Sequence, residues 1–325
     1  MSYTKSVVLP VSPDEAFALV TEPERLRRWQ TVTAVVDLRA GGSYRWAVTP
    51  GHLAGGTFRE VEPGRRIVFG WGWDGNDALP YDASTVTVTV EPTEGGSKVT
   101  LVHEGLTEEQ AKAHAEGWDH YLERLERAAT SGDAGPDEWA YAPENLDPIV
   151  AAEAALAVVQ PVLRNLTAED QPKPTPCRDL TCHELAEHLL TSLGQLAAMA
   201  GAGDEIALTG TLENRVSVAA GRAIEAWRNV DLNGTVPGPG GSPMPARFLA
   251  GVLPLEIALH GWDLAQASGQ SMHISDELVA YLREIADEVV PGGRGRSFAD
   301  EVSPAEDASP IDRLAAFAGR TPLVA

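Results

Sequence analysis

The hydrophobic pattern changes its period once along the chain, and this change constrains the fold more than any other feature. Up to about residue 105, apolar and polar residues alternate in short runs, and residues 85–90 read Thr-Val-Thr-Val-Thr-Val. Such alternation predicts strands with one buried face. From residue 107 the apolar residues recur at helical spacing, which predicts a long helix over about 107–129. The segment 131–137, Ser-Gly-Asp-Ala-Gly-Pro-Asp, then interrupts all periodicity.

The order of elements predicts a different fold class for each half. The first half is expected to be an α+β domain in which a curved antiparallel sheet surrounds a long C-terminal helix. Its strands are expected at 3–11, 33–37, 43–49, 55–61, 66–73, 85–91 and 98–104. The second half is expected to be an all-α four-helix bundle with an appendix. Its helices are expected at 146–162, 181–200, 212–227, 245–267, 275–289 and 311–318.

The length of 325 residues favours two domains over one. We place the first domain at 1–130, a linker at 131–140 and the second domain at 141–325.

Composition excludes two classes of partner. Acidic residues outnumber Lys plus Arg by 47 to 25, which gives a formal charge of −22 that repels nucleic acids and anionic membrane surfaces. The apolar runs are too short for a membrane span, and the first residues lack the pattern of a secretory signal. The only cysteines, Cys177 and Cys182, do not make a disulfide framework. The chain is therefore predicted to be cytoplasmic, with structural thiols.

Glu256 and His260 carry the strongest chemical signal. They lie four residues apart in a predicted helix and so share one face, about one turn apart. Their surroundings are apolar, and a buried Glu and His need a partner or an ion to offset desolvation. A third ligand is expected from another helix, where His188 falls near the inward face. His183 lies in the first turn of that helix and points elsewhere.

A site of two imidazoles and one carboxylate leaves one to three coordination positions open. This arrangement is typical of a catalytic rather than a structural metal site. It suits zinc best, with nickel, iron and manganese as alternatives. Asp263 lies three residues after His260 on the same face. It is expected either to orient that histidine or to hydrogen-bond to a neighbouring helix.

Four tryptophans at alternating strand positions or on the long helix of the first domain are candidates for lining any ligand cavity that this domain contains, because small-molecule pockets are mostly apolar. The candidates are Trp46, Trp71, Trp73 and Trp118. The alternative is that these tryptophans are ordinary core. The histidines of this domain show no metal-ligand spacing and are expected to be surface or internally satisfied residues: His52, His103, His114 and His120.

The first half resembles the helix-grip, START-like superfamily, in the branch related to the activator of Hsp90 ATPase. The resemblance covers about residues 3–130 and rests on motifs in the same order and spacing at 11–17, Trp29, 41–44, 61–67 and 117–122. It implies a long helix gripped by a curved sheet, with an apolar cavity between them. It names no reaction, so that binding a small ligand, contacting a partner and forming a homodimer all stay open.

The second half resembles the DinB-like family of metal-binding four-helix bundles, in the branch of mycothiol-dependent maleylpyruvate isomerase. The resemblance covers about residues 140–322 and rests on the motif at 174–177 with the helix bearing His188, on 256–265, and on the closing motif at 312–322. It implies His188, Glu256 and His260 as the protein ligands and mycothiol as a cosubstrate. The sequence departs from the family pattern at Gly261.

These features predict a divalent-metal-dependent thiol isomerase or S-transferase that acts on a small electrophilic substrate. A bound ion would lower the pKa of the thiol and so deliver a thiolate to an electrophilic carbon. Three arginines are candidates for binding a substrate carboxylate: Arg215, Arg222 and Arg247. The alternative function is non-enzymatic binding or sensing of a small hydrophobic ligand, with the metal only bracing the bundle.

Overall fold

The structure is a computed structural model that describes residues 1–140, 143, 145–177, 179–204 and 206–323. The chain divides into two compact units, unit 1 (Met1–Gly135) and unit 2 (Pro136–Ala325). The division falls inside the linker expected at 131–140. The expected start of the second domain, residue 141, lies outside the described residues.

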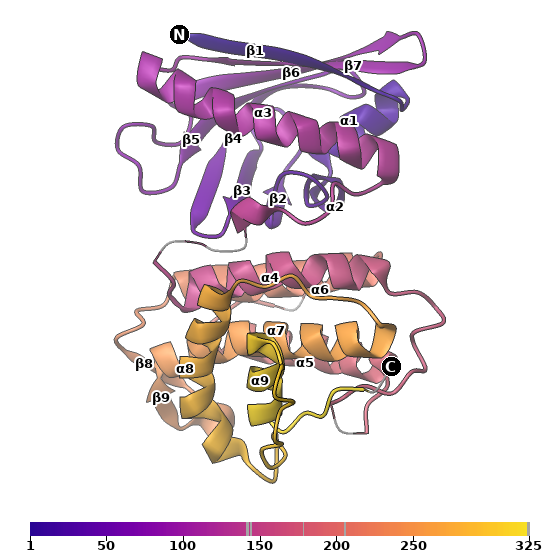
Figure 1. Ribbon diagram of the computed structural model, residues 1–325. Coiled ribbons are helices and arrows are strands. Elements are labelled where there is room, and N and C mark those ends of the chain that lie inside the picture. The colour runs from indigo at the N-terminus through magenta and orange to yellow at the C-terminus, as the bar shows by residue number, and fades with distance from the viewer. Residues whose placement is uncertain (141–142, 144, 178, 205, 324–325) are drawn as a thin grey trace. The chain divides into compact units, whose positions relative to one another are not determined.

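Unit 1 is built on a seven-stranded antiparallel sheet, along which the long helix α3 lies (Figure 1). The strand order is β1-β7-β6-β5-β4-β3-β2, so β1 and β2 form the two edges of the sheet, and the short helices α1 and α2 lie between them in the chain. The elements are β1 (Ser2–Leu9), α1 (Pro13–Thr21), α2 (Pro23–Leu26), β2 (Thr33–Val36), β3 (Ser43–Thr49), β4 (His52–Glu62), β5 (Arg66–Trp73), β6 (Ser84–Thr93), β7 (Gly96–Glu104) and α3 (Glu108–Ser131).

The alternation in the sequence becomes alternating burial in the sheet. Along β6, Val86, Val88 and Val90 are buried, while the threonines between them are partly exposed. The period of two residues places every valine of this strand on the face that α3 covers. The apolar face of the sheet therefore follows directly from the local pattern.

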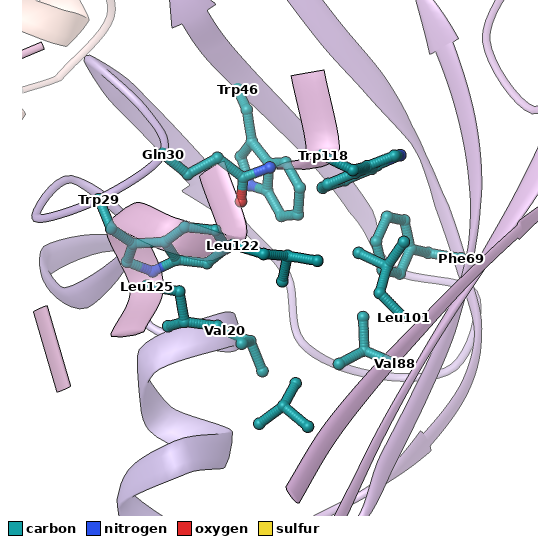
Figure 2. A pocket seen from close by; sticks show the side chains of 11 residues that line it. Val20, Trp29, Gln30, Trp46, Phe69, Val88, Leu101, Trp118, Leu122 and Leu125 are labelled. Atoms are coloured by element: carbon teal, nitrogen blue, oxygen red, sulfur yellow. The ribbon is translucent and has the colours of Figure 1, made fainter. Parts of the chain in front are cut away.

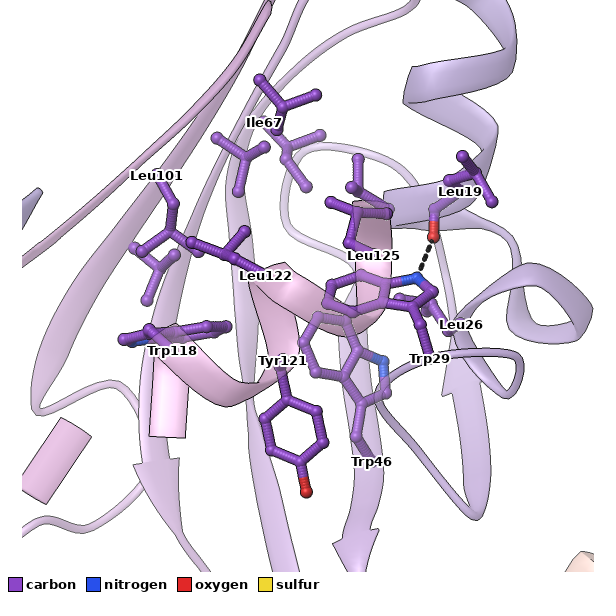
Figure 3. Close-up of a cluster of buried hydrophobic side chains, with 14 of the residues drawn as sticks. Leu19, Leu26, Trp29, Trp46, Ile67, Leu101, Trp118, Tyr121, Leu122 and Leu125 are labelled. Carbon is purple, nitrogen blue, oxygen red and sulfur yellow. Dashed lines mark hydrogen bonds between the residues drawn. The ribbon is translucent and has the colours of Figure 1, made fainter. Parts of the chain in front are cut away.

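The core of unit 1 lies between this face and α3 (Figure 3). Trp118, Leu122 and Leu125 form the buried stripe of α3, as their spacing in the sequence predicts. Trp29 packs in the same core, and its indole N–H donates to the carbonyl oxygen of Leu19 at 2.8 Å. This hydrogen bond satisfies the polar end of an otherwise apolar side chain.

The described part of unit 2 is helical apart from one hairpin of β8 and β9. Helices α4 and α5 each pack on α6 and α7, α8 packs on α4 and α7, and α9 packs on α7 and α8. The elements are η1 (Glu138–Ala140), α4 (Pro148–Asn165), α5 (Cys182–Met199), α6 (Leu212–Arg228), β8 (Thr235–Pro237), η2 (Pro239–Gly241), β9 (Pro243–Pro245), α7 (Ala246–Ser268), α8 (Asp276–Gly293) and α9 (Pro310–Phe317).

Helix α7 is the buried central helix of unit 2. Among the described residues it is the one helix long and apolar enough to cross a membrane, but 83% of its apolar window is buried within the protein. A helix that is apolar on all sides and covered by other helices is a core helix. At Gly261, α7 approaches α4 so closely that an added Cβ would lie 2.2 Å from Cγ2 of Val159.

Candidate functional site

Helices α5 and α7 carry the three expected metal ligands. Thr181 and Glu184 form a capping box that fixes the start of α5, and with it the position of His188 on the helix. Helix α7 carries Glu256 and His260 one turn apart, and α5 packs against α7. Burial increases across the three side chains, since His188 is exposed, Glu256 is partly buried and His260 is buried.

The structure brings His188, Glu256 and His260 together. One donor atom of each lies within 4.8 Å of a donor atom of both others. The Nε2 atom of His260 lies 3.3 Å from Oε2 of Glu256, and the two imidazole rings stand 5.1 Å apart between centroids. Donors bound at about 2.0–2.2 Å to one zinc ion stand roughly 3–4 Å apart. Small side-chain movements would therefore bring all three donors onto one ion.

One oxygen of Glu256 provides the test of whether the residues fit an ion. Oε2 is buried and accepts no hydrogen bond from any described residue, although His260 is close by. A buried carboxylate oxygen without a partner is costly, and such an atom calls for an explanation such as an ion. A divalent ion between the three donors would satisfy it. The two nitrogens and one oxygen suit zinc and also allow nickel, iron or manganese.

Without an ion, the charged forms of His260 and Glu256 stabilise each other across the 3.3 Å between Nε2 and Oε2. Burial lowers the pKa of His260, but its hydrogen bonds, that to Asp263 foremost, outweigh burial and hold the pKa well above its usual value. Burial raises the pKa of Glu256, but the interaction with His260 outweighs it, so this pKa is lowered. Burial lowers the pKa of His188, as does the nearby His260. A divalent ion must therefore displace a proton from His260, whereas His188 favours the neutral form.

Asp263 and Arg320 support His260 on the side away from Glu256. The Nδ1–H of His260 donates to Oδ2 of Asp263 at 3.1 Å, and Nε of Arg320 lies 3.0 Å from each oxygen of that carboxylate. All three side chains are buried. Asp263 thus contacts the histidine, as one of the two alternatives expected, and its other partner, Arg320, follows the end of α9 and does not lie on a neighbouring helix. Arg320 was not among the predicted site residues, and the closing motif at 312–322 was its only signal.

Cys177 lies beside the same histidine. Its Sγ lies within 4.8 Å of a ring nitrogen of His260 and of a carboxylate oxygen of Asp263, so these residues form a second group of potential ligands. Arg320 already pairs with that carboxylate, which favours the group of His188, Glu256 and His260 as the ion site. The sequence pattern did not indicate this proximity of Cys177.

The three arginines expected to bind a substrate carboxylate lie elsewhere or have other partners. Arg215 pairs with Glu187 at 2.9 Å. Arg222 donates to two backbone carbonyls of the loop between α5 and α6. Arg247 lies in the first turn of α7, roughly two and a half turns before Glu256 and three and a half before His260. Arg320 is instead the arginine that adjoins the ligand group.

Unit 1 contains a small apolar cavity between α3 and the sheet (Figure 2). Trp46 and Trp118 line it together with aliphatic and aromatic side chains and Gln30. Trp71 and Trp73, the other two predicted candidates, are not among its lining residues. The volume of the cavity is about 20 Å³, which is enough for about one water. A small-molecule ligand would enter only if unit 1 opened.

Trp71 and Trp73 instead converge on His114. Both indole N–H groups donate to Nε2 of His114, each at 3.2 Å. An indole nitrogen can only donate, so Nε2 must accept, and the proton of the neutral ring lies on Nδ1. This Nδ1–H donates to the carbonyl oxygen of Gln110 at 2.8 Å. Each polar atom of this group therefore has a partner.

Hydrogen bonds at both ring nitrogens likewise fix the tautomer of His103. The indole N–H of Trp118 donates to Nδ1 of His103 at 3.1 Å, so the neutral ring carries its proton on Nε2. This N–H points at Oγ of Ser84, 2.8 Å away. The hydroxyl of Ser84 donates onward to the carbonyl oxygen of Trp71. His103 therefore cannot act as a base towards Ser84, and the pair serves the structure of unit 1 rather than nucleophilic catalysis.

Acidification is expected to weaken unit 1. Burial, and to a lesser degree the nearby His114, lowers the pKa of His103 to about 3, below its ordinary value of 6.5. Below pH 6.5 the unfolded chain therefore binds a proton that the folded unit excludes. The free energy of unfolding thus decreases as the pH is lowered. Urea denaturation should show a loss of about 2 kcal/mol from this residue between pH 6.5 and 5. His103→Gln should flatten this dependence, and an unchanged slope would mean that another group causes it.

Comparison with known proteins relates both units to others. Residues 10–130 match the family described as "Activator of Hsp90 ATPase homolog 1-like protein". Two proteins of Mycobacterium tuberculosis, "Uncharacterized protein MT0763" and "Uncharacterized protein Rv0738", are each 32% identical to the chain over 182 residues. The alignment covers 54% of this chain and 99% of each relative. It is longer than unit 1 and so includes part of unit 2.

Two solved structures are also similar. An AHSA1-like protein from Rhizobium etli, determined by solution NMR, is 37% identical, with 45% of this chain and 91% of that chain covered and a TM-score of 0.37. The Aha1 dimer from Colwellia psychrerythraea is 16% identical, with 41% and 98% covered and a TM-score of 0.37. The chain belongs to the family of the two mycobacterial proteins, and its residues 10–130 form an AHSA1-like domain.

Proposed function

We propose that unit 2 is an enzyme domain that binds one divalent ion, zinc in the first place, through His188, Glu256 and His260. The observation that carries the proposal is the convergence of these side chains from two helices around a buried oxygen of Glu256 that accepts no hydrogen bond from the described residues. A ligand set of this kind is typical of catalytic zinc sites, which keep a position open for water or substrate. The exposure of His188 supports an open side that faces solvent.

We propose further that the reaction uses a small thiol and takes place in the cytoplasm. The resemblance of unit 2 to the DinB-like family, in the branch of mycothiol-dependent maleylpyruvate isomerase, supports mycothiol or a similar thiol as the cosubstrate. A divalent ion in this site would lower the pKa of that thiol.

The residues of the chain divide the remaining work between them. His260 is buried and held by Asp263, so it would fix the inner side of the site. His188 is exposed and would border the side from which thiol and electrophile arrive. The net reaction would be isomerisation of a maleyl-type acid or transfer of the sulfur to a small electrophile.

Metal analysis and a thiol-dependence assay test this proposal together. The purified protein is expected to contain stoichiometric divalent metal and to convert a maleyl-type electrophile only when the thiol is present. Protein stripped by a chelator is the control, and metal alone should restore its activity. Bound metal without thiol-dependent turnover would contradict the enzyme function, and absence of metal would contradict the whole proposal.

The cavity of unit 1 favours a second candidate function, the binding or sensing of a small hydrophobic ligand. Its lining is almost entirely apolar, which suits such a ligand. Its present size requires unit 1 to open before a ligand can enter. A fluorescent apolar probe that binds the native protein at neutral pH, and that a bulkier residue in place of Val88 displaces, would support this candidate.

A further inference from the structure

The closing segment of the chain reaches α7 directly beside the metal ligands. Nε of Arg320 lies 3.0 Å from both carboxylate oxygens of Asp263. The indole N–H of Trp262 donates to Oδ1 of Asp312 at 2.9 Å. Trp262 and Asp263, which follow His260 after one glycine, thus each contact the closing segment at 312–322. None of the three proposed metal ligands comes from this segment.

We propose that Arg320 is a positioning residue of the metal centre, which acts through Asp263 on His260. The inference rests on the proposed function and adds a residue to it. Oδ2 of Asp263 accepts the Nδ1–H of His260, and this fixes the orientation of the ring. The opposite nitrogen, Nε2, then points to the carboxylate of Glu256, 3.3 Å away, where the ion would lie.

Asp263 depends on Arg320 to hold this position. The carboxylate is fully buried, and a buried charge without a partner is strongly unfavourable. His260 and Asp263 lie on adjacent turns of one helix, so α7 alone offers this carboxylate only the imidazole. Arg320 comes from a segment 57 residues further along the chain and contacts both oxygens. Loss of the guanidinium would therefore free the carboxylate to rotate, and with it the ring of His260.

Contacts with α8 and α9 also fix the position of Arg320. Its backbone N–H donates to the carbonyl oxygen of Ala315 in α9, at 3.0 Å. The guanidinium of Arg294, at the end of α8, donates to the carbonyl oxygen of Phe317 at 2.6 Å and lies 5.3 Å from the centre of its ring. Contacts with α8 and α9 thus hold the backbone around Arg320 in place, and with it the guanidinium that pairs with Asp263.

Cobalt binding tests this inference, because Co²⁺ replaces zinc in such sites and reports its geometry by visible absorption. Arg320→Met is expected to weaken Co²⁺ binding by about 10–100-fold in chelator competition and to change the spectrum. Arg320→Lys should recover part of the affinity, since an ammonium group still pairs with Asp263. Arg313→Met is the matched control, because Arg313 is exposed and donates to the backbone carbonyl oxygens of Ala308 and Glu306.

A second variant covers the case in which Arg320→Met does not fold. Asp263→Asn with Arg320→Met leaves no unpaired buried charge, and it should fold and bind Co²⁺ about tenfold more weakly than the wild type. Wild-type affinity and spectrum in either folded variant would overturn the inference and leave the proposed function standing. Failure of the wild-type protein to bind Co²⁺ would overturn both.

Discussion

His188→Ala and His260→Ala are each expected to reduce the bound divalent metal to background in elemental analysis. Each substitution removes one of the three protein donors that converge in unit 2. His188→Ala is the cleaner experiment, because this side chain is exposed and its loss leaves no cavity in the core. His260→Ala removes a buried ring and should also cost stability, so its metal content is interpreted together with its unfolding curve.

His183→Ala provides the matched control. His183 lies on the same helix as His188, is exposed, and does not belong to the ligand group. The variant should keep stoichiometric metal. Full metal content in His188→Ala, or loss of metal in His183→Ala, would contradict the ligand assignment.

Features that depend on neighbours in the sequence were predictable. The change to a helical period at residue 107 anticipates α3, which begins at Glu108. The helix expected at 181–200 begins as α5 at Cys182, where Thr181 and Glu184 form the capping box. The spacing of Glu256 and His260 places them on one face of α7 whatever else packs around it. In each case backbone geometry over a few residues decides the outcome.

Features that depend on packing between distant segments were not predictable. Alternation along β3 and β5 indicates that Trp46, Trp71 and Trp73 share a face, but it does not say which neighbours they meet. The indole N–H groups of Trp71 and Trp73 donate to His114, which lies 43 and 41 residues further along the chain. Arg320 likewise contacts Asp263 only because the closing segment folds back onto α7, 57 residues after Asp263 in the chain.

Gly261→Ala is expected to lower the free energy of unfolding of unit 2 by about 3 kcal/mol. The added Cβ would lie 2.2 Å from Cγ2 of Val159 and 3.1 Å from its Cβ. Rotation of the valine cannot remove both contacts, so α4 and α7 must separate. The higher helix propensity of alanine, about 1 kcal/mol, offsets only part of this cost. Urea denaturation of the metal-free protein measures the change. Gly194→Ala in α5, where an added Cβ meets nothing within 4 Å, should be neutral or stabilising.

Val159→Ala tests whether this one contact is the cause. It removes both γ carbons and leaves only the 3.1 Å contact between Cβ atoms, which a small shift relieves. The double variant Gly261→Ala with Val159→Ala should therefore be more stable than the sum of the two single changes predicts. Because Gly261 directly follows His260, the single variant should also weaken divalent-ion binding, and the double variant should regain part of it. Strict additivity of the two stability changes would instead mean that Gly261 does not set the approach of α7 to α4, and that the geometry of the metal centre has another origin.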